Sequence, residues 1–168
     1  KDKVKEVVGD VMGELFVGNL HRFCINFLYD NNIVPIDTGI LDDVDQNDVL
    51  AEMLNTTEPK SWDVKGILDY SCKLMEEELE FPIELLLHKN APYTDYYGRV
   101  QYHTLATQYR QIKKDNKVID FDDILYLTYD ALRNPDYRED YIHSAYKWIQ
   151  VDEVQDLNPL QLSIIDKL

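Results

Sequence analysis

Apolar residues recur along most of the chain with the period of an amphipathic helix. The clearest example follows Asn19, where one face collects residues at i, i+3, i+4, i+7 and i+8: Leu20, Phe23, Cys24, Phe27 and Leu28. Asn19 is a favourable N-cap, and the polar run 30–32 is expected to end the helix. This pattern predicts a helix with one buried face.

Further helices are predicted in the middle of the chain. Ser61 can cap a helix that reaches about Phe81, with the acidic run 76–80 as its solvated end and Pro82 starting a new element. A later, long helix has an apolar face that comprises Tyr102, Leu105, Ala106, Tyr109 and Ile112. The polar residues 113–117 predict a turn at its end.

The segment 118–135 gives the strongest helical signal. Its apolar face consists of Phe121, Ile124, Leu125, Thr128 and Leu132. Asp120 can cap this helix, Asp122 and Asp123 favour its N-terminal dipole, and Asn-Pro at 134–135 ends it. We therefore assign these three aspartates packing and capping roles, not catalytic ones. A short helix is expected over 135–143.

Strand-like patterns are confined to two stretches, residues 14–18 and 147–152. The first is a β-prone run closed by Gly18. The second is an apolar run around Trp148, Ile149 and Val151. The sequence thus predicts a mostly α fold with two strands.

Two adjacent carboxylates, Asp152 and Glu153, follow the second predicted strand. Ligand sites of parallel sheets lie beyond the carboxyl ends of the strands, and Asn158-Pro159 predicts a helix start directly after the acidic turn. This arrangement suits nucleotide hydrolysis, in which one carboxylate holds Mg²⁺ and its neighbour activates the attacking water. The alternative is that Asp152, Glu153 and Asp156 only cap the next helix and favour its dipole.

A second acidic segment resembles a calcium loop only in part. Asp43, Asp45 and Asn47 alternate as EF-hand ligands do, but the sixth position is Asp48 instead of Gly and the twelfth is Leu54 instead of Glu. We interpret this segment as an acidic turn and the first turn of a helix.

Charge limits the partners of the chain. Its 17 Lys and Arg against 32 Asp and Glu give a net charge of −15, which repels phosphate backbones, so any DNA contact must be local. Two separate cysteines indicate neither a disulfide framework nor a zinc site, and a reducing cytoplasm is the expected location. No apolar run approaches the roughly 20 residues of a membrane helix, and no membrane partner is expected.

Three segments, in order, resemble the UvrD/Rep/PcrA class of superfamily 1 DNA helicases. "IQVDEVQDLNPLQ" (149–161) is similar to the Walker B segment usually read as VDEFQDTN followed by Gln. "VGNLHRFC" (17–24) is similar to VGTFHSFC, and "VIDFDDIL" (118–125) contains a close match to DFDDLL. The three matches extend over most of the chain.

The resemblance implies an ATP-dependent helicase or translocase, an ATP hydrolase that binds single-stranded and duplex DNA and functions in DNA repair. By position it makes Asp152 the Mg²⁺ ligand, Glu153 the general base and Gln155 the sensor of the γ-phosphate, with Asp156 supporting the motif. Asn19 and His21 would contact DNA, although Leu20 replaces the family's stacking Phe.

The resemblance also implies a division into domains. Residues 1–32 and 118–168 would belong to a RecA-like α/β P-loop NTPase domain, whose sheet would contain the two predicted strands as a small parallel β part. Residues 33–117 would form a helical insertion domain. The chain holds no G-x-x-x-x-G-K-[ST] motif, so we expect it to be an excised segment that is inactive by itself and works with the remaining helicase domains in cis.

Two other interpretations stay open at this stage. One is an acidic, all-helical protein-interaction module with a basic partner, which predicts a continuous acidic face and no parallel strand pair. The other is the helicase subunit of an ATP-dependent nuclease. A parallel pairing of 14–18 with 147–152 would favour the helicase interpretation over the interaction module.

Overall fold

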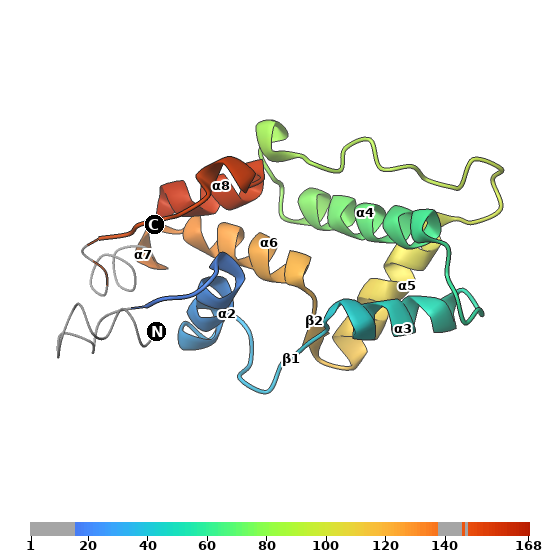
Figure 1. The fold of residues 1–168 in the computed structure, drawn as a ribbon, viewed down its shortest axis with the longest axis horizontal. Coiled ribbons are helices and arrows are strands. Elements are labelled where there is room, and N and C mark those ends of the chain that lie inside the picture. The colour runs from blue at the N-terminus through green and yellow to red at the C-terminus, as the bar shows by residue number, and fades with distance from the viewer. Residues whose placement is uncertain (1–15, 138–145, 147) are drawn as a thin grey trace. The chain divides into compact units, whose positions relative to one another are not determined.

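The fold was obtained as a computed structural model that describes residues 16–137, 146 and 148–168 (Figure 1). The chain forms two compact units, one of Lys1–Val34 with Leu127–Leu168 and the other of Pro35–Tyr126. We call them the terminal unit and the central unit. The assignment of 1–32 and 118–168 to a RecA-like domain, and of 33–117 to a helical insertion, stays a prediction. The division into two compact units does not test which domain each segment belongs to.

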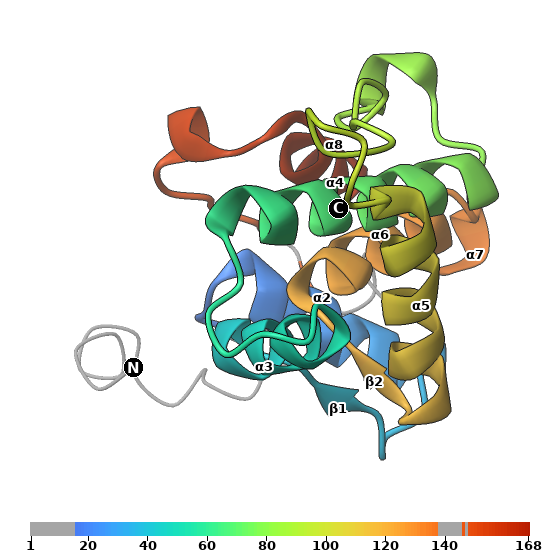
Figure 2. The same ribbon diagram turned by 90° about the vertical axis from the view of Figure 1, so that its right-hand side faces the viewer.

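The central unit is built from helices. Its elements are β1 (Gly39–Ile40), α3 (Asp43–Met53), α4 (Ser61–Glu78), the 3-10 turn η2 (Ile83–Leu85), α5 (Tyr102–Asp115) and β2 (Val118–Ile119), followed by the start of α6 (Phe121–Leu132). Helix α5 packs against both α4 and α3 and crosses them (Figure 2). The core between them consists of Leu50, Ile67, Tyr70, Tyr102, Ala106 and Tyr109.

Two of the helix starts differ in how they are capped. Asp42 caps α3, because its Oδ1 accepts hydrogen bonds from the backbone N–H of Val44 and of Asp45, both 2.9 Å. This agrees with the acidic-turn interpretation of the calcium-like segment. Ser61 does not cap α4; it is the first helical residue, and Lys60 holds the N-cap position without a side-chain hydrogen bond.

The described strands pair in parallel but lie outside the predicted stretches. Gly39 is in register with Val118 and Ile40 with Ile119. The backbone N–H of Gly39 donates to the Lys117 carbonyl at 3.0 Å, which extends the pairing by one residue. A mostly α fold with two parallel strands is therefore found, but the described parts of the predicted strands, 16–18 and 148–152, are not among them.

The residues 16–18 and 148–152, which the structure describes within the two predicted strands, are not in strand conformation. Trp148 is 93% exposed and Ile149 44% exposed. A β-prone run becomes a strand only when a neighbouring strand takes up its backbone hydrogen bonds and its apolar face is covered. The β propensity of these residues indicates neither a neighbouring strand nor coverage of their apolar side chains.

The terminal unit contains α2 (Leu20–Asp30), the second half of α6, α7 (Pro135–Tyr137), the 3-10 turn η4 (Val154–Asp156) and α8 (Pro159–Lys167). The predicted Asn19 cap is confirmed, since the Arg22 N–H donates to Asn19 Oδ1 at 2.9 Å. The core of this unit includes Cys24, Phe27, Leu28, Leu132, Leu160 and Ile164. The predicted helix over 135–143 is found at 135–137, and its remainder lies outside the described residues.

Candidate functional site: the acidic turn before α8

The four predicted ATPase residues lie together on one short exposed turn. Asp152, Glu153, Gln155 and Asp156 all have exposed side chains. The Glu153 N–H donates to Asp152 Oδ1 at 2.9 Å, and the Gln155 side-chain amide donates to Glu153 Oε2. The turn therefore presents two adjacent carboxylates, with an amide in contact with the second.

Glu153 has an unusual backbone conformation for a residue with a side chain. Its φ of 52° and ψ of 38° lie in the left-handed region. Such a conformation costs about 1–3 kcal/mol for a residue other than glycine. Here it reverses the chain so that Asp156 N–H can donate to the Glu153 carbonyl at 3.0 Å and start η4.

The helix after the turn begins at a fully formed capping box. The Gln161 N–H donates to Asn158 Oδ1 at 2.8 Å, and the Asn158 N–H donates to Gln161 Oε1 at 3.0 Å. Pro159 occupies the first helical position. The predicted cap is confirmed. Asn158 caps α8, so Asp152 and Glu153 do not, while Glu153 holds the N-cap position of η4 without a side-chain hydrogen bond.

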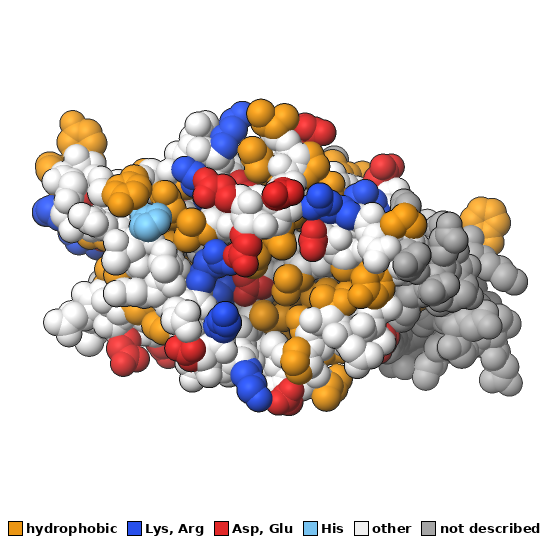
Figure 3. Space-filling model, turned by 180° about the vertical axis from the view of Figure 1, so that it is seen from behind, with side chains coloured by type: hydrophobic (Ala, Val, Ile, Leu, Met, Phe, Trp, Pro, Cys, Tyr) orange, Lys and Arg blue, Asp and Glu red, His pale blue; other side chains and the backbone are white. Residues whose placement is uncertain are grey.

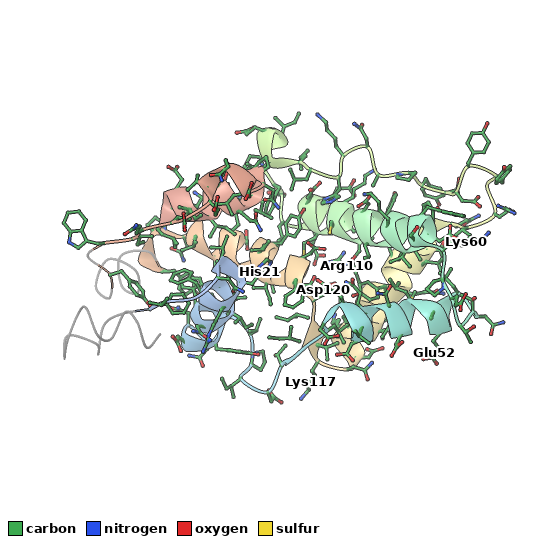
Figure 4. The ribbon with its side chains drawn as sticks, in the orientation of Figure 1. His21, Glu52, Lys60, Arg110, Lys117 and Asp120 are labelled. Carbon is green, nitrogen blue, oxygen red and sulfur yellow. The ribbon has the colours of Figure 1, made fainter. Side chains whose placement is uncertain are left out.

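The two predicted DNA-contacting residues lie at the start of α2. Asn19 is exposed, and its side chain is engaged in the cap of α2. His21 lies in the first turn of the helix and is half-buried (Figure 4). Asn19 and His21 thus lie close together at the start of α2, and they are far from the acidic turn in sequence.

The donor chemistry of the acidic turn fits part of a magnesium site. Mg²⁺ is bound through one or two carboxylates together with water and phosphate oxygens, in preference to an all-protein cage. Asp152 and Glu153 supply such carboxylates. Within the described residues no group of three or more His, Cys, Asp or Glu side chains could hold a metal ion, so the turn would depend on oxygens from the nucleotide and water.

A buried ionic cluster in the central unit was missed by the sequence analysis. Lys113 is only 4% exposed, and its Nζ lies 2.7 Å from Asp120 Oδ2 and 2.6 Å from Asp123 Oδ2. The Tyr109 hydroxyl also donates to Asp120 Oδ2, at 2.9 Å. Asp120 caps α6 through its Oδ1, which accepts from the Asp123 N–H at 2.9 Å, as predicted (Figure 4).

The ionic cluster shifts the pKa values of its members. Burial acts to lower the pKa of Lys113, but attraction by Asp123 and Asp120 outweighs it and raises that pKa. Burial acts to raise the pKa of Asp120, and the nearby ammonium lowers it overall. For Asp123, burial and the charge of Asp120 together raise the pKa. These groups thus hold one buried positive charge between two carboxylates.

The signal for Lys113 was present in the sequence. Tyr102, Ala106, Tyr109 and Lys113 occur at helical spacing, so Lys113 continues the buried stripe of α5. The predicted polar turn at 113–117 is therefore wrong for Lys113, which lies in α5. A charged residue on a buried stripe indicates that an opposite charge lies nearby.

Glu76 is a second correction, because it was assigned to a solvated acidic run and is 1% exposed. Its Oε1 accepts from the Leu87 N–H at 2.9 Å, the Tyr126 hydroxyl at 2.8 Å and His88 Nδ1 at 3.0 Å. Burial acts to raise the pKa of Glu76, but the hydrogen bonds from His88 and Tyr126 outweigh it and lower that pKa. This cluster ties the segment after η2 to α4 and α6.

Neither cysteine belongs to a reactive site. Cys24 and Cys72 are buried and free. Burial raises the pKa of the Cys24 thiol to about 12 and also raises that of Cys72, so both remain protonated at neutral pH. Among the described residues, no helix has both the length and the apolar character that a membrane span requires.

Comparison with known proteins identifies the family. The model of the UvrD/REP helicase N-terminal domain matches residues 1–168. The chain is 25% identical over 173 residues to the ATP-dependent DNA helicase PcrA of Staphylococcus aureus, and 27% identical over 174 residues to that of Bacillus subtilis. Each alignment covers 100% of this chain and 23% of the relative. The chain belongs to the UvrD/REP helicase N-terminal domain family.

Proposed function

We propose that this chain is part of an ATP-dependent DNA helicase or translocase that couples ATP hydrolysis to movement on single-stranded DNA and to duplex unwinding. The observation that carries the proposal is the acidic turn 152–156, which lies where the resemblance predicts the Walker B motif. The family match over residues 1–168 supports it. The chain spans about a quarter of the length of the curated relatives it matches, and in this proposal the activity belongs to a longer protein that contains it.

In this proposal each residue of the turn has one role. Asp152 binds Mg²⁺, Glu153 accepts the proton of the attacking water, Gln155 senses the γ-phosphate and Asp156 supports the motif. Mg²⁺ with ATP supplies the charge neutralisation that phosphoryl transfer requires. The hydrogen bond from Gln155 to Glu153 supports a link between the sensor and the base, because a movement of the amide would change the environment of the carboxylate.

The contact with DNA is assigned to the start of α2. Asn19 and the neighbouring backbone can donate hydrogen bonds to a phosphate, and His21 can do so through its imidazole. Such contacts fix the position of the strand without reading its sequence. A local contact of this kind is compatible with the net charge of −15.

The decisive experiment replaces the proposed base in the full-length parent protein. Glu153→Gln removes the proton acceptor but keeps the size of the side chain, so DNA-stimulated ATP hydrolysis should fall by about 10²–10⁴-fold. Binding of a fluorescent ATP analogue should stay near that of the wild type. Glu84→Gln, an exposed acidic residue outside the turn, is the control. Unchanged turnover in Glu153→Gln would remove Glu153 from the mechanism.

The 168-residue chain should be inactive by itself. It has carboxylates for Mg²⁺ but no Gly-rich loop with Lys and Ser or Thr to hold the phosphates. We therefore expect negligible ATP binding by calorimetry and no phosphate release. Mg²⁺-dependent hydrolysis by the purified chain would contradict this expectation.

The acidic interaction module is the weaker alternative. It required a continuous acidic face and no parallel strand pair. β1 and β2 do pair in parallel, and in the middle of the face seen in Figure 3 acidic and basic side chains lie next to one another. The strand pair does not involve the predicted stretches, so the family match, and not the pair, favours the helicase interpretation.

A further inference from the structure

A turn in the central unit carries a group of aromatic rings that are exposed to solvent and do not belong to the hydrophobic core. Tyr96 is 95% exposed, Tyr97 72% and Tyr93 54%. Single exposed apolar residues are common on protein surfaces, but three tyrosines within five positions are a local concentration. We call the segment 93–99 the tyrosine turn.

The tyrosine turn is held in place by its own hydrogen bonds. Asp95 Oδ1 accepts from the Arg99 N–H at 2.6 Å, and the Asp95 N–H donates to the Val100 carbonyl at 2.9 Å. Gly98 has a φ of +68°, which a residue with a side chain rarely adopts, and its N–H donates to the Asp95 carbonyl at 2.9 Å. Thr94 forms an antiparallel bridge with Gln101. The rings are thus displayed by a preorganised backbone.

The base of the turn is fixed to α4 and α5. The ring of Tyr93 stacks on His103, with centroids 5.3 Å apart, and meets the edge of Tyr70 at 6.0 Å. The Tyr102 hydroxyl donates to Asp63 Oδ1 at 3.0 Å. Tyr93 is therefore partly structural, while Tyr96 and Tyr97 extend beyond it, with their own rings 5.2 Å apart and perpendicular.

Cations accompany the exposed rings. The guanidinium of Arg99 lies 4.5 Å from the ring centroid of Tyr97. On the first turns of α4, the helix that Tyr102 contacts, Lys60 Nζ lies 5.2 Å from the ring of Trp62, which is 61% exposed. Residues 86–103 contain Lys89 and Arg99 against Asp95 alone, in a chain whose net charge is −15. Arg99 pairs with Asp95, its Nε 3.3 Å from Oδ2, so Lys89 carries the net positive charge of this segment, and a polyanion is repelled less here than by the acidic average of the chain.

We propose that the tyrosine turn binds single-stranded DNA by stacking unpaired bases on Tyr96 and Tyr97, with Arg99 facing the phosphates or stacking beside them. Exposed aromatic rings next to cations form stacking platforms for single strands, and every base has a face that can stack. A protein partner would instead need a larger contiguous apolar patch, whereas Tyr96 and Tyr97 contact only each other here and have the guanidinium of Arg99 beside them. The surface is distinct from Asn19 and His21 and does not require ATP.

The test measures binding of fluorescein-labelled oligo(dT), about 15 nucleotides long, to the 168-residue chain by fluorescence anisotropy. We expect a Kd of about 10⁻⁴–10⁻⁶ M, the range of sequence-independent binding. Because few phosphates are contacted, raising the salt from about 50 to about 200 mM should weaken binding by less than about tenfold. A blunt duplex of the same length should bind at least about tenfold more weakly, since its bases are not free to stack.

Matched variants separate stacking from general apolar contact. Tyr96→Leu/Tyr97→Leu should raise the Kd at least about tenfold, whereas Tyr96→Phe/Tyr97→Phe should keep it within about twofold, because phenylalanine retains the ring. Ile83→Ala, an exposed apolar residue on η2, should have no effect. All these side chains are exposed, and circular dichroism melting curves check that folding is unaffected.

Three outcomes would overturn the proposal. The first is the absence of binding by the wild-type chain, and the second is equal affinity of the Leu and Phe double variants. The third is loss of binding in Asn19→Ala/His21→Ala with no loss in Tyr96→Leu/Tyr97→Leu, which would assign the single-strand contact to α2. Retained binding in Asn19→Ala/His21→Ala supports the tyrosine turn even if the proposed ATPase roles fail.

Discussion

The ammonium of Lys113 and the carboxylate of Asp123 form an ion pair of 2.6 Å inside the central unit. Asp120 completes this ionic cluster from the N-cap of α6, and both carboxylates are buried. Helix α5 and the N-terminal end of α6 are therefore joined through one buried positive charge. A charge in such a place is stable only while its partners remain.

Replacing Lys113 should strongly destabilise the fold. Lys113→Met keeps the length of the side chain but leaves the two carboxylates buried without a cation, which should cost about 3–5 kcal/mol of unfolding free energy. Urea denaturation followed by circular dichroism measures the change. Lys114→Met, the exposed neighbour, should stay within about 0.5 kcal/mol of the wild type. A loss as small as that of Lys114→Met would show that the ionic cluster is not needed.

The members of this cluster should also be energetically coupled. In the triple variant Lys113→Met/Asp120→Asn/Asp123→Asn, no unpaired buried charge remains. Its loss of unfolding free energy should therefore be smaller than the sum of the separate losses, by about 0.5–3 kcal/mol. Additive losses in the same urea experiments would contradict a direct interaction.

Glu76 should make stability depend on pH. Its pKa in the folded protein is lowered from the usual value of 4.5, so its contribution is complete above pH 4.5 and is lost as the pH falls below that value. The difference in unfolding free energy between wild type and Glu76→Gln should therefore shrink as the pH falls through this range. Urea unfolding at a series of pH values tests this. Glu77→Gln, on the exposed side of α4, should show no such trend.

Gly66 should resist a substitution that usually stabilises helices. A Cβ at this position would lie 2.5 Å from ring atoms of Tyr102, closer than side chains pack. Gly66→Ala should therefore destabilise the central unit by about 1–3 kcal/mol instead of stabilising it. In Gly66→Ala/Tyr102→Leu the ring is gone, so the alanine should then cost less than it does beside Tyr102. Thermal melting of the four proteins of this cycle measures both effects.

The capping box of α8 gives a local prediction in the terminal unit. Asn158→Ala removes the acceptor for the Gln161 N–H and should cost about 0.5–2 kcal/mol, whereas Asn158→Ser keeps a capping oxygen and should cost much less. Equal losses in the two variants would mean that the side-chain oxygen is unimportant. Hydrogen exchange of the α8 amides would locate the change.

Helix starts could be predicted from the sequence because their signals are local. Asn19, Asp120 and Asn158 were all expected as caps and accept the corresponding backbone hydrogen bonds. The acidic residues of the turn before α8 were also expected to lie together. Their assigned roles in ATP hydrolysis stay predictions, because they depend on a nucleotide and on parts outside this chain.

What failed were features that depend on distant parts of the chain. Pairing of Gly39 with Val118 could not be read from either short segment, and a strand at 148–152 was predicted from propensity without a partner. Lys113 and Glu76 were assigned to solvent because they are charged, yet each is buried by groups from other elements. The charge of a side chain indicates that it requires polar partners, but only the fold shows whether those partners are water or buried protein groups.

The short parallel ladder of β1 and β2 has a consequence for how the central unit can vary. It holds the backbone at Gly39 and Val118 one strand spacing apart, about 4.8 Å, although residues 40–117 separate them along the chain. The start and the end of that excursion are therefore at the same place. Because lengthening a loop whose ends are already joined costs little entropy, residues can be inserted into the excursion without moving its two ends, provided that α5 and its buried Lys113 stay in place. The ladder thus leaves the length of this part of the molecule free to vary.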